Sequence, residues 1–149
     1  MSIVLDIVGE AVAKGRGRVG KDAKGNARVF TPVATKNYEY LIRLVAGRVM
    51  AGRPPLEGPV DVDVAVMIAY PNSGTKKKLT DAREGRSRPC TKPDIDNYVK
   101  SALDGINKVV FVDDNQVVTL HARKLYGAVP GMRIEVRETY QPAGIEDII

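Results

Sequence analysis

The feature that most limits the fold of this chain is a strict alternation of side chains over residues 60–70. One set of alternate positions is apolar, whereas the other set holds Asp61, Asp63 and Ala65. Successive side chains of a β-strand lie on opposite faces of the sheet, so the pattern predicts a strand with one buried and one solvated face. We interpret Asp61 and Asp63 as residues of the solvated face and leave them outside any functional site. The apolar set is Val60, Val62, Val64, Val66 and Ile68.

Further segments show the pattern of strands or helices. Residues 3–8 predict an opening strand, and apolar residues at helical spacing predict a helix from Thr31-Pro32, with threonine as its cap, to Gly52. Residues 117–125 and 132–140 predict two strands joined as a closing hairpin, with Ile134 and Val136 facing inward. With 149 residues, 44% of them apolar, the chain is expected to form one α+β domain, with a mixed sheet and helices mainly on one face.

A short helix over residues 95–108 is expected to carry carboxylates at both of its ends. Asp94 and Asp96 lie at its N-terminus, and Asp96, Lys100 and Asp104 form a polar row along it. Residues 109–112 predict a short extended segment that takes Asp113-Asp114 either back along the helix or across its far end. The apolar stripe of this helix is Ile95, Val99, Ala102, Leu103, Ile106 and Val110.

Carboxylates gathered in this way repel one another unless a hard cation with oxygen ligands neutralises them. Mg²⁺ fits best and Mn²⁺ is also suitable, whereas one cysteine and one histidine are too few ligands for zinc. Such a cation lowers the pKa of water and stabilises charge on a phosphodiester, with Lys100 assisting at the phosphate or the leaving oxygen. The alternative reading is structural, because Asp-x-Asp-Asn after proline is an ordinary helix start and Asp-Asp-Asn an ordinary turn.

The acidic stretch resembles the signature of the RusA family of Holliday junction resolvases. The resemblance implies that Asp94, Asp96 and Asp114 are essential metal-binding carboxylates and that Lys100 assists them; we add Asp113 to the candidate metal ligands. Lys108 departs from the family pattern, which often has glycine there, but it replaces no carboxylate. The residues that carry the resemblance are Lys92-Pro93-Asp94-Ile95-Asp96-Asn97, Lys100, Asp104, Ile106-Asn107 and Asp113-Asp114-Asn115-Gln116-Val117.

Two basic segments are predicted to contact DNA phosphates, although ordinary solvated loops are the alternative. Residues 13–28 are a Gly-rich loop with six cations against Asp22, and they resemble an early basic loop of the same family without its prolines. Residues 71–92 are a second basic loop that leads directly to Asp94. The candidate DNA-binding residues are Lys14, Arg16, Arg18, Arg28, Lys76, Lys77, Lys78, Arg86, Arg88 and Lys92.

The resemblance further implies a homodimer whose paired sites suit a four-way junction. Our hypothesis is a Mg²⁺-dependent endodeoxyribonuclease that resolves such junctions by symmetric paired nicking in DNA recombination and repair, in agreement with a net charge of +5. Two alternatives are a metal-dependent nuclease acting on other branched or flap DNA and a non-catalytic protein that binds branched DNA.

Residue patterns show no leader and no membrane-spanning stretch, and Cys90 is the lone cysteine, so a cytoplasmic protein without a membrane partner is expected. The tail from Gln141 is expected to fray.

Overall fold

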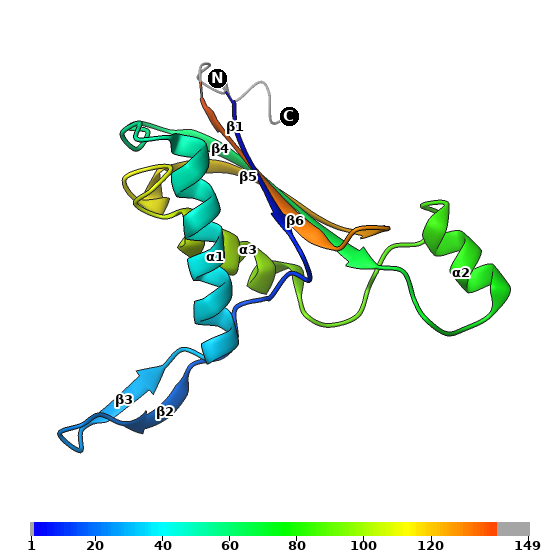
Figure 1. Ribbon diagram of the computed structural model, residues 1–149, viewed down its shortest axis with the longest axis horizontal. Helices are drawn as coiled ribbons and strands as arrows, with labels where there is room; N and C mark the ends of the chain where they lie inside the picture. Colours follow the sequence, from blue (N-terminus) through cyan, green and yellow to red (C-terminus); the bar gives the residue numbers. More distant parts are fainter. Residues whose placement is uncertain (1, 140–149) are drawn as a thin grey trace, which may run out of the picture.

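A mixed four-stranded sheet carries two helices on one face, and two arms project from this body (Figure 1). The computed structural model describes residues 2–139, so the predicted fraying of the tail lies outside the described residues. The sheet order is β1-β6-β4-β5, with β4 parallel to β5 and antiparallel to β6, and β6 antiparallel to β1. The predicted α+β class with a mixed sheet is therefore confirmed. The strands of this sheet are β1 (Ser2–Val8), β4 (Val60–Ala69), β5 (Val117–Gly127) and β6 (Gly131–Glu138).

The apolar set of β4 forms the centre of the core, as the alternation predicts. Val60, Val62, Val64 and Val66 are each at most 1% exposed, and they pack beneath α1 (Val33–Met50) and α3 (Ile95–Ile106). Ile134 and Val136 of β6 face the same core, as expected. Burial of this apolar surface is the main force that holds the helices on the sheet.

The contact between α1 and α3 depends on a glycine. A Cβ atom at Gly105 would lie 2.6 Å from Cβ of Ile42, so the two helices approach too closely there for any other residue. This contact turns α3 so that Tyr98 and Ser101 are buried, while Ile95 is 37% exposed. The predicted apolar stripe is therefore wrong at Ile95, because α1 covers a face slightly rotated from the one that apolar spacing alone indicates.

Two predicted features of the C-terminal half are wrong. β5 and β6 do not pair as a hairpin, because β4 lies between them and bonds to both. Residues 109–112 form no strand; they turn, and Phe111 makes only isolated bridges to Leu56 and Asn107. Val110 and Phe111 are fully buried, so this segment serves the core and not the edge of a sheet.

Both basic segments contain regular structure where loops were predicted. Residues 13–28 contribute to a separate hairpin of β2 (Arg18–Lys21) and β3 (Ala27–Phe30), and the second segment contains α2 (Lys76–Arg83). Local polar contacts stabilise both arms: Oδ1 of Asp22 accepts hydrogen bonds from two turn amides, and Oγ1 of Thr75 caps α2. The basic composition of the two segments does not reveal these contacts. The expected threonine cap of α1 is wrong, since its N-cap is Pro32 without a side-chain bond.

No helix within residues 2–139 has the length and apolarity that a bilayer span requires.

Candidate functional site

The N-terminus of α3 presents two exposed carboxylates to solvent. Asp94 occupies the N-cap position but makes no side-chain capping bond, and Asp96 lies in the first turn. Both residues are exposed, and neither carboxylate has a hydrogen bond or ion pair within residues 2–139. The helix dipole stabilises negative charge at this end, and free carboxylate oxygens at such a position are available to a cation.

Lys124 of β5 fixes the backbone that delivers these carboxylates. Its Nζ donates to the carbonyl oxygen of Thr91 at 2.6 Å and to that of Pro93 at 3.0 Å. Lys124 pairs with Val66 in the parallel register, so its side chain leaves β5 on the helix-bearing face of the sheet. Sequence reasoning missed this residue, because its acceptors are backbone atoms; the one signal was a lysine at an inward position of the strand.

Replacing Lys124 with methionine is expected to loosen the segment before α3. The change removes two charge-assisted hydrogen bonds while keeping the length of the side chain, so the free energy of unfolding should fall by about 1–2 kcal/mol. Hydrogen exchange should accelerate at the first amides of α3, and Lys124→Arg should restore part of the protection. Equal exchange in the wild type and the methionine variant would show that the bonds do not hold this segment.

Residues of the first basic segment meet the N-terminus of α3. An open depression of about 430 Å³ is lined by Arg16, Lys92, Pro93, Asp94 and Asn97. The amide of Lys14 donates to the carbonyl oxygen of Asn97 at 2.8 Å, which fixes the segment against the helix. Guanidinium, ammonium and carboxylate groups thus share one open surface. Such a surface suits a phosphate group whose charge is neutralised by Arg16 and Lys92 on one side and by a cation held at the carboxylate on the other.

The ammonium group of Lys14 connects α1 to α3. Its Nζ lies 2.7 Å from Oε1 of Glu39 and 2.8 Å from Oδ2 of Asp104. Burial opposes the charged form of Lys14, but the hydrogen bonds to Asp104 and Glu39 outweigh it and raise the pKa of Lys14. Its charge is therefore engaged within the chain, whereas the candidate role of Lys14 at DNA stays a prediction.

Asp113 and Asp114 lie across the far end of α3, which decides between the two predicted placements. Asp114 begins a short 3₁₀ helix, η1 (Asp114–Gln116), directly before β5. The side-chain oxygen of Gln116 accepts from the Asp113 amide at 2.8 Å, and its amide group donates to the carbonyl oxygens of Leu56 at 2.9 Å and Gly58 at 2.8 Å. Gln116 thereby anchors this acidic turn, a role that sequence reasoning did not assign.

The two acidic pairs are separated by the length of α3. A helix of 12 residues is about 18 Å long. Among the described residues there is no group of three or more Asp, Glu, His or Cys that could hold a metal ion. Lys100 is exposed one turn beyond Asp96, on the polar row that runs toward the other pair. One chain therefore places Asp94 and Asp96 at the N-terminus of α3, Lys100 one turn further along it, and Asp113 and Asp114 beyond its other end.

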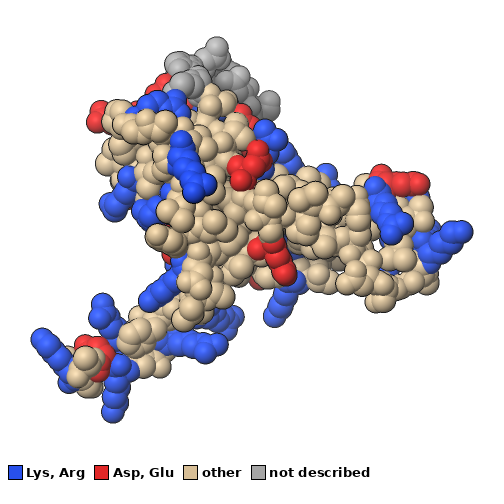
Figure 2. All heavy atoms as spheres, viewed as in Figure 1, with Lys and Arg blue, Asp and Glu red and all other residues tan. Residues whose placement is uncertain are grey.

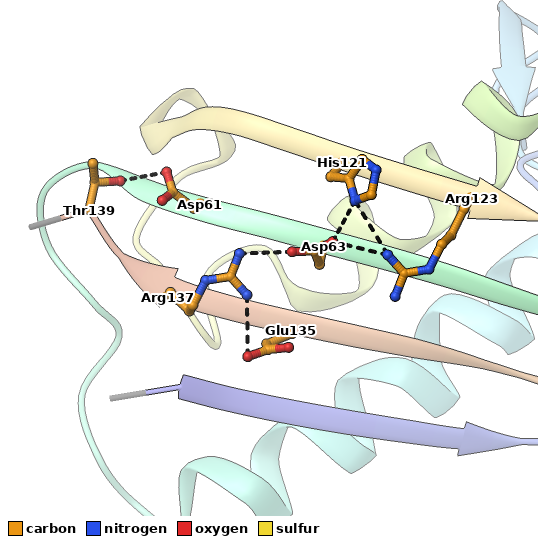
Figure 3. A network of polar contacts seen from close by, with 7 residues as sticks. All are labelled: Asp61, Asp63, His121, Arg123, Glu135, Arg137 and Thr139. Atoms are coloured by element: carbon orange, nitrogen blue, oxygen red, sulfur yellow. Dashed lines mark hydrogen bonds and ion pairs between the residues drawn. The ribbon is translucent and has the colours of Figure 1, made fainter. Parts of the chain in front are cut away.

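Asp61 and Asp63 belong to a separate network on the open face of the sheet (Figure 3). Oγ1 of Thr139 donates to Asp61 at 2.7 Å. Asp63 has three partners on the neighbouring strands: Arg137 at 2.8 Å, His121 at 3.0 Å and Arg123 at 3.6 Å. The hydrogen bond from Arg137, with that from His121, holds the pKa of Asp63 below its ordinary value. Asp61 is thus engaged by a hydroxyl group and Asp63 by ion pairs, and neither residue lines the depression beside Asp94.

Asp63→Asn is expected to cost stability in a pH-dependent way. The folded-state pKa of Asp63 is depressed, so its contribution is complete above the unfolded pKa near 3.8 and is lost as the pH falls through the folded value. The variant should lose about 1 kcal/mol at pH 7, since the partners are partly exposed, and almost nothing near pH 2. Urea unfolding at the two pH values measures this, and an equal loss at both would contradict the ion-pair account.

The remaining candidate DNA-binding residues lie mainly on the two arms (Figure 2). Arg86 is paired with Asp81 at 2.9 Å and with Glu84, so α2 and the residues after it keep part of their charge within the chain. The other members of the set are exposed and have no side-chain partner within the described part of the chain: Arg16, Arg18, Arg28, Lys76, Lys77, Lys78, Arg88 and Lys92.

Comparisons with known proteins agree with this arrangement. The family model described as Endodeoxyribonuclease RusA matches residues 9–137, which include both basic arms and both acidic pairs. The chain is also 39% identical over 140 residues to the uncharacterized protein YqaN of Bacillus subtilis (strain 168), and the match covers 91% of this chain and 96% of that protein.

Proposed function

Since the chain belongs to the RusA family of endodeoxyribonucleases, we propose that it resolves Holliday junctions by paired, symmetric, Mg²⁺-dependent nicking in DNA recombination and repair. The family implies an enzyme that hydrolyses phosphodiester bonds in branched DNA. The single observation that carries the more specific proposal is the free Asp94-Asp96 pair beside the cationic depression formed with Arg16 and Lys92. Carboxylates without a partner repel phosphate, so their exposure on a DNA-binding surface calls for a cation between them and the substrate.

The candidate ligands are of the chemical type that a hard divalent cation prefers. The candidate ligands are carboxylates, and Asp94 keeps its oxygens free where an N-cap side chain usually binds the helix backbone. Asp94 and Asp96 would hold Mg²⁺, or Mn²⁺ in its place, together with Asp114 and Asp113. When bound, such an ion supplies a lowered pKa for a water molecule and neutralisation of charge on the phosphate. Lys100 would stabilise negative charge at the phosphate or at the leaving oxygen.

A second copy of the chain offers a way to complete this set. In a twofold dimer with two α3 helices side by side and antiparallel, Asp113 and Asp114 of one copy would approach Asp94 and Asp96 of the other. Exposed apolar side chains adjoin the Asp113-Asp114 turn, and such groups are typical of subunit contacts: Val112 is 50%, Val118 59% and Leu120 46% exposed. We therefore propose a homodimer with two equivalent sites, each drawing carboxylates from both subunits.

The proposal is tested by incubating the purified protein with an end-labelled synthetic four-way junction and Mg²⁺. We expect two nicks at symmetric positions on opposed strands, loss of both with EDTA, and no nicking of the matching linear duplex. Equal cleavage of flap and junction substrates would replace junction resolution with a broader branched-DNA nuclease. Junction binding without cleavage in either Mg²⁺ or Mn²⁺ would leave only a binding protein.

A further inference from the structure

The β2–β3 hairpin is a free-standing ribbon with an uncovered apolar pair. It forms its own two-stranded sheet, does not pair with the main sheet, and projects from the body near the start of α1 (Figure 1). Val19 and Val29 are directly opposite each other in its register, with 80% and 67% of their surfaces exposed. Directly opposed residues share a face of the ribbon, so these valines form one apolar patch that the described residues leave open to solvent.

The opposite face of the ribbon is basic and is covered in part by an aromatic ring. Arg18 pairs with Phe30, and Gly20 pairs with Arg28, so these four residues share that face. A Cβ atom at Gly20 would lie 2.9 Å from Cε2 of Phe30, which shows that the ring packs directly against the glycine. Phe30 therefore stabilises the ribbon itself. Of the two valines, Val29 packs one methyl group against Gly17, where a Cβ atom would lie 2.4 Å from its Cγ1, but most of both side chains stays exposed.

Charge identifies the class of partner that can cover the valines. The arm carries Arg16, Arg18, Lys21, Lys24 and Arg28 with Asp22 as the one acid between residues 13 and 30, and Oδ1 of Asp22 accepts hydrogen bonds from two turn amides. Figure 2 shows basic side chains gathered along the arm. A second copy of so cationic a ribbon would be repelled, so the surface suits a polyanion that also offers apolar area.

Branched DNA combines a polyanionic backbone with accessible apolar surface at its branch point. Base faces are covered by stacking in a continuous duplex and are accessible where base pairs open, as at a branch point, and apolar side chains are known to enter such openings as wedges. Resting on the proposed function, we propose that the β2–β3 hairpin is a branch-point wedge, with Val19 and Val29 against unstacked bases and the arm's arginines on the flanking phosphates.

The position of the arm couples the wedge to the candidate carboxylates. Arg16, at the root of the hairpin, lines the depression beside Asp94. Val19 is three residues further on, or about 10 Å along an extended strand, which corresponds to about three base-pair steps of 3.4 Å. A base held at the valines therefore places nearby phosphates of its strand at the depression, so that recognition of the branch fixes the position of the cut.

The test compares Val19→Ser/Val29→Ser with Arg18→Ala/Arg28→Ala and with Val33→Ser, a matched control at an exposed valine outside the arm. Binding to a four-way junction and to linear duplex is measured in EDTA, with 2-aminopurine at the branch point reporting unstacking. The valine variant should keep its affinity for duplex, lose about tenfold of its preference for the junction and lose the rise in fluorescence. The arginine variant should bind both the junction and the duplex more weakly, and its binding should depend less on salt concentration.

Several outcomes would overturn the wedge. Unchanged branch preference and fluorescence in the valine variant would do so, as would the same loss in Val33→Ser. A change in sedimentation mass without a change in branch preference would show that the valines contact a second copy. Since binding is measured without metal, these results are independent of cleavage: a wild type that opens the branch but never cuts it refutes the proposed function and leaves the wedge standing. Circular dichroism verifies the fold of each variant.

Discussion

Replacing Asp96 with asparagine is expected to abolish cleavage of a four-way junction while leaving junction binding intact or slightly tighter. The substitution keeps the shape of the side chain and removes an exposed negative charge in the first turn of α3, which has no partner within residues 2–139. If this carboxylate holds a divalent cation, its loss removes both charge neutralisation and water activation, so the rate should fall by about 10³-fold or more. Binding should not suffer, because a charge that repels phosphate is lost.

The matched control for this experiment is Asp6→Asn. Asp6 is an exposed carboxylate of β1, 3.8 Å from Arg133, and both side chains belong to the open face of the sheet. The control should cleave at the wild-type rate. Single-turnover cleavage and gel-shift binding in Ca²⁺ measure the two effects separately. A rate within tenfold of wild type for Asp96→Asn would remove this residue from the metal site, and a parallel loss in the Asp6 variant would indicate a general charge effect.

The sequence predicts the position of the first acidic pair well because its determinants are local. A proline, two aspartates and apolar residues at helical spacing are enough to place Asp94 and Asp96 at the start of α3, whose observed N-cap is Asp94. The stripe on α3 was less predictable, since its orientation depends on how closely Gly105 allows Ile42 of another helix to approach. That contact joins residues far apart in the chain.

The closing hairpin of β5 and β6 was a wrong prediction because strand pairing is a long-range property. Two consecutive strands with a short turn favour a hairpin, yet β6 bonds to β4 and β1, and β5 bonds to β4. The order strand, helix, strand from β4 through α3 to β5 is that of a parallel crossover, so a signal for the parallel pair was present. The intervening α2 arm lengthened the connection and concealed it. Lys124 and Gln116 were missed for a related reason, since both bind backbone carbonyls that no residue pattern reveals.

Mixing two inactive variants provides the sharpest test of a site shared between subunits. Asp96→Asn removes a carboxylate in the first turn of α3, and Asp114→Asn removes one beyond the other end of this 12-residue helix, which is about 18 Å long. Each variant alone should be inactive. In a mixed dimer with shared sites, both substitutions fall in the same site, and the other site keeps all of its carboxylates. Random assembly from equal amounts then leaves about a quarter of all sites intact.

The kind of product distinguishes this arrangement from every alternative within one chain. A mixed dimer with one intact site should nick one strand of the junction without making the second, symmetric cut, so nicked junctions should accumulate and linear resolution products should not. If each site were built from one chain, every site in the mixture would carry one substitution and no nicks would appear. Co-refolding the two variants with different affinity tags allows the mixed dimer to be isolated, and mixing each variant with itself provides the control. Activity in the mixture alone would mean that dimerisation is required for the chemistry, since only a second copy can bring Asp114 to Asp96.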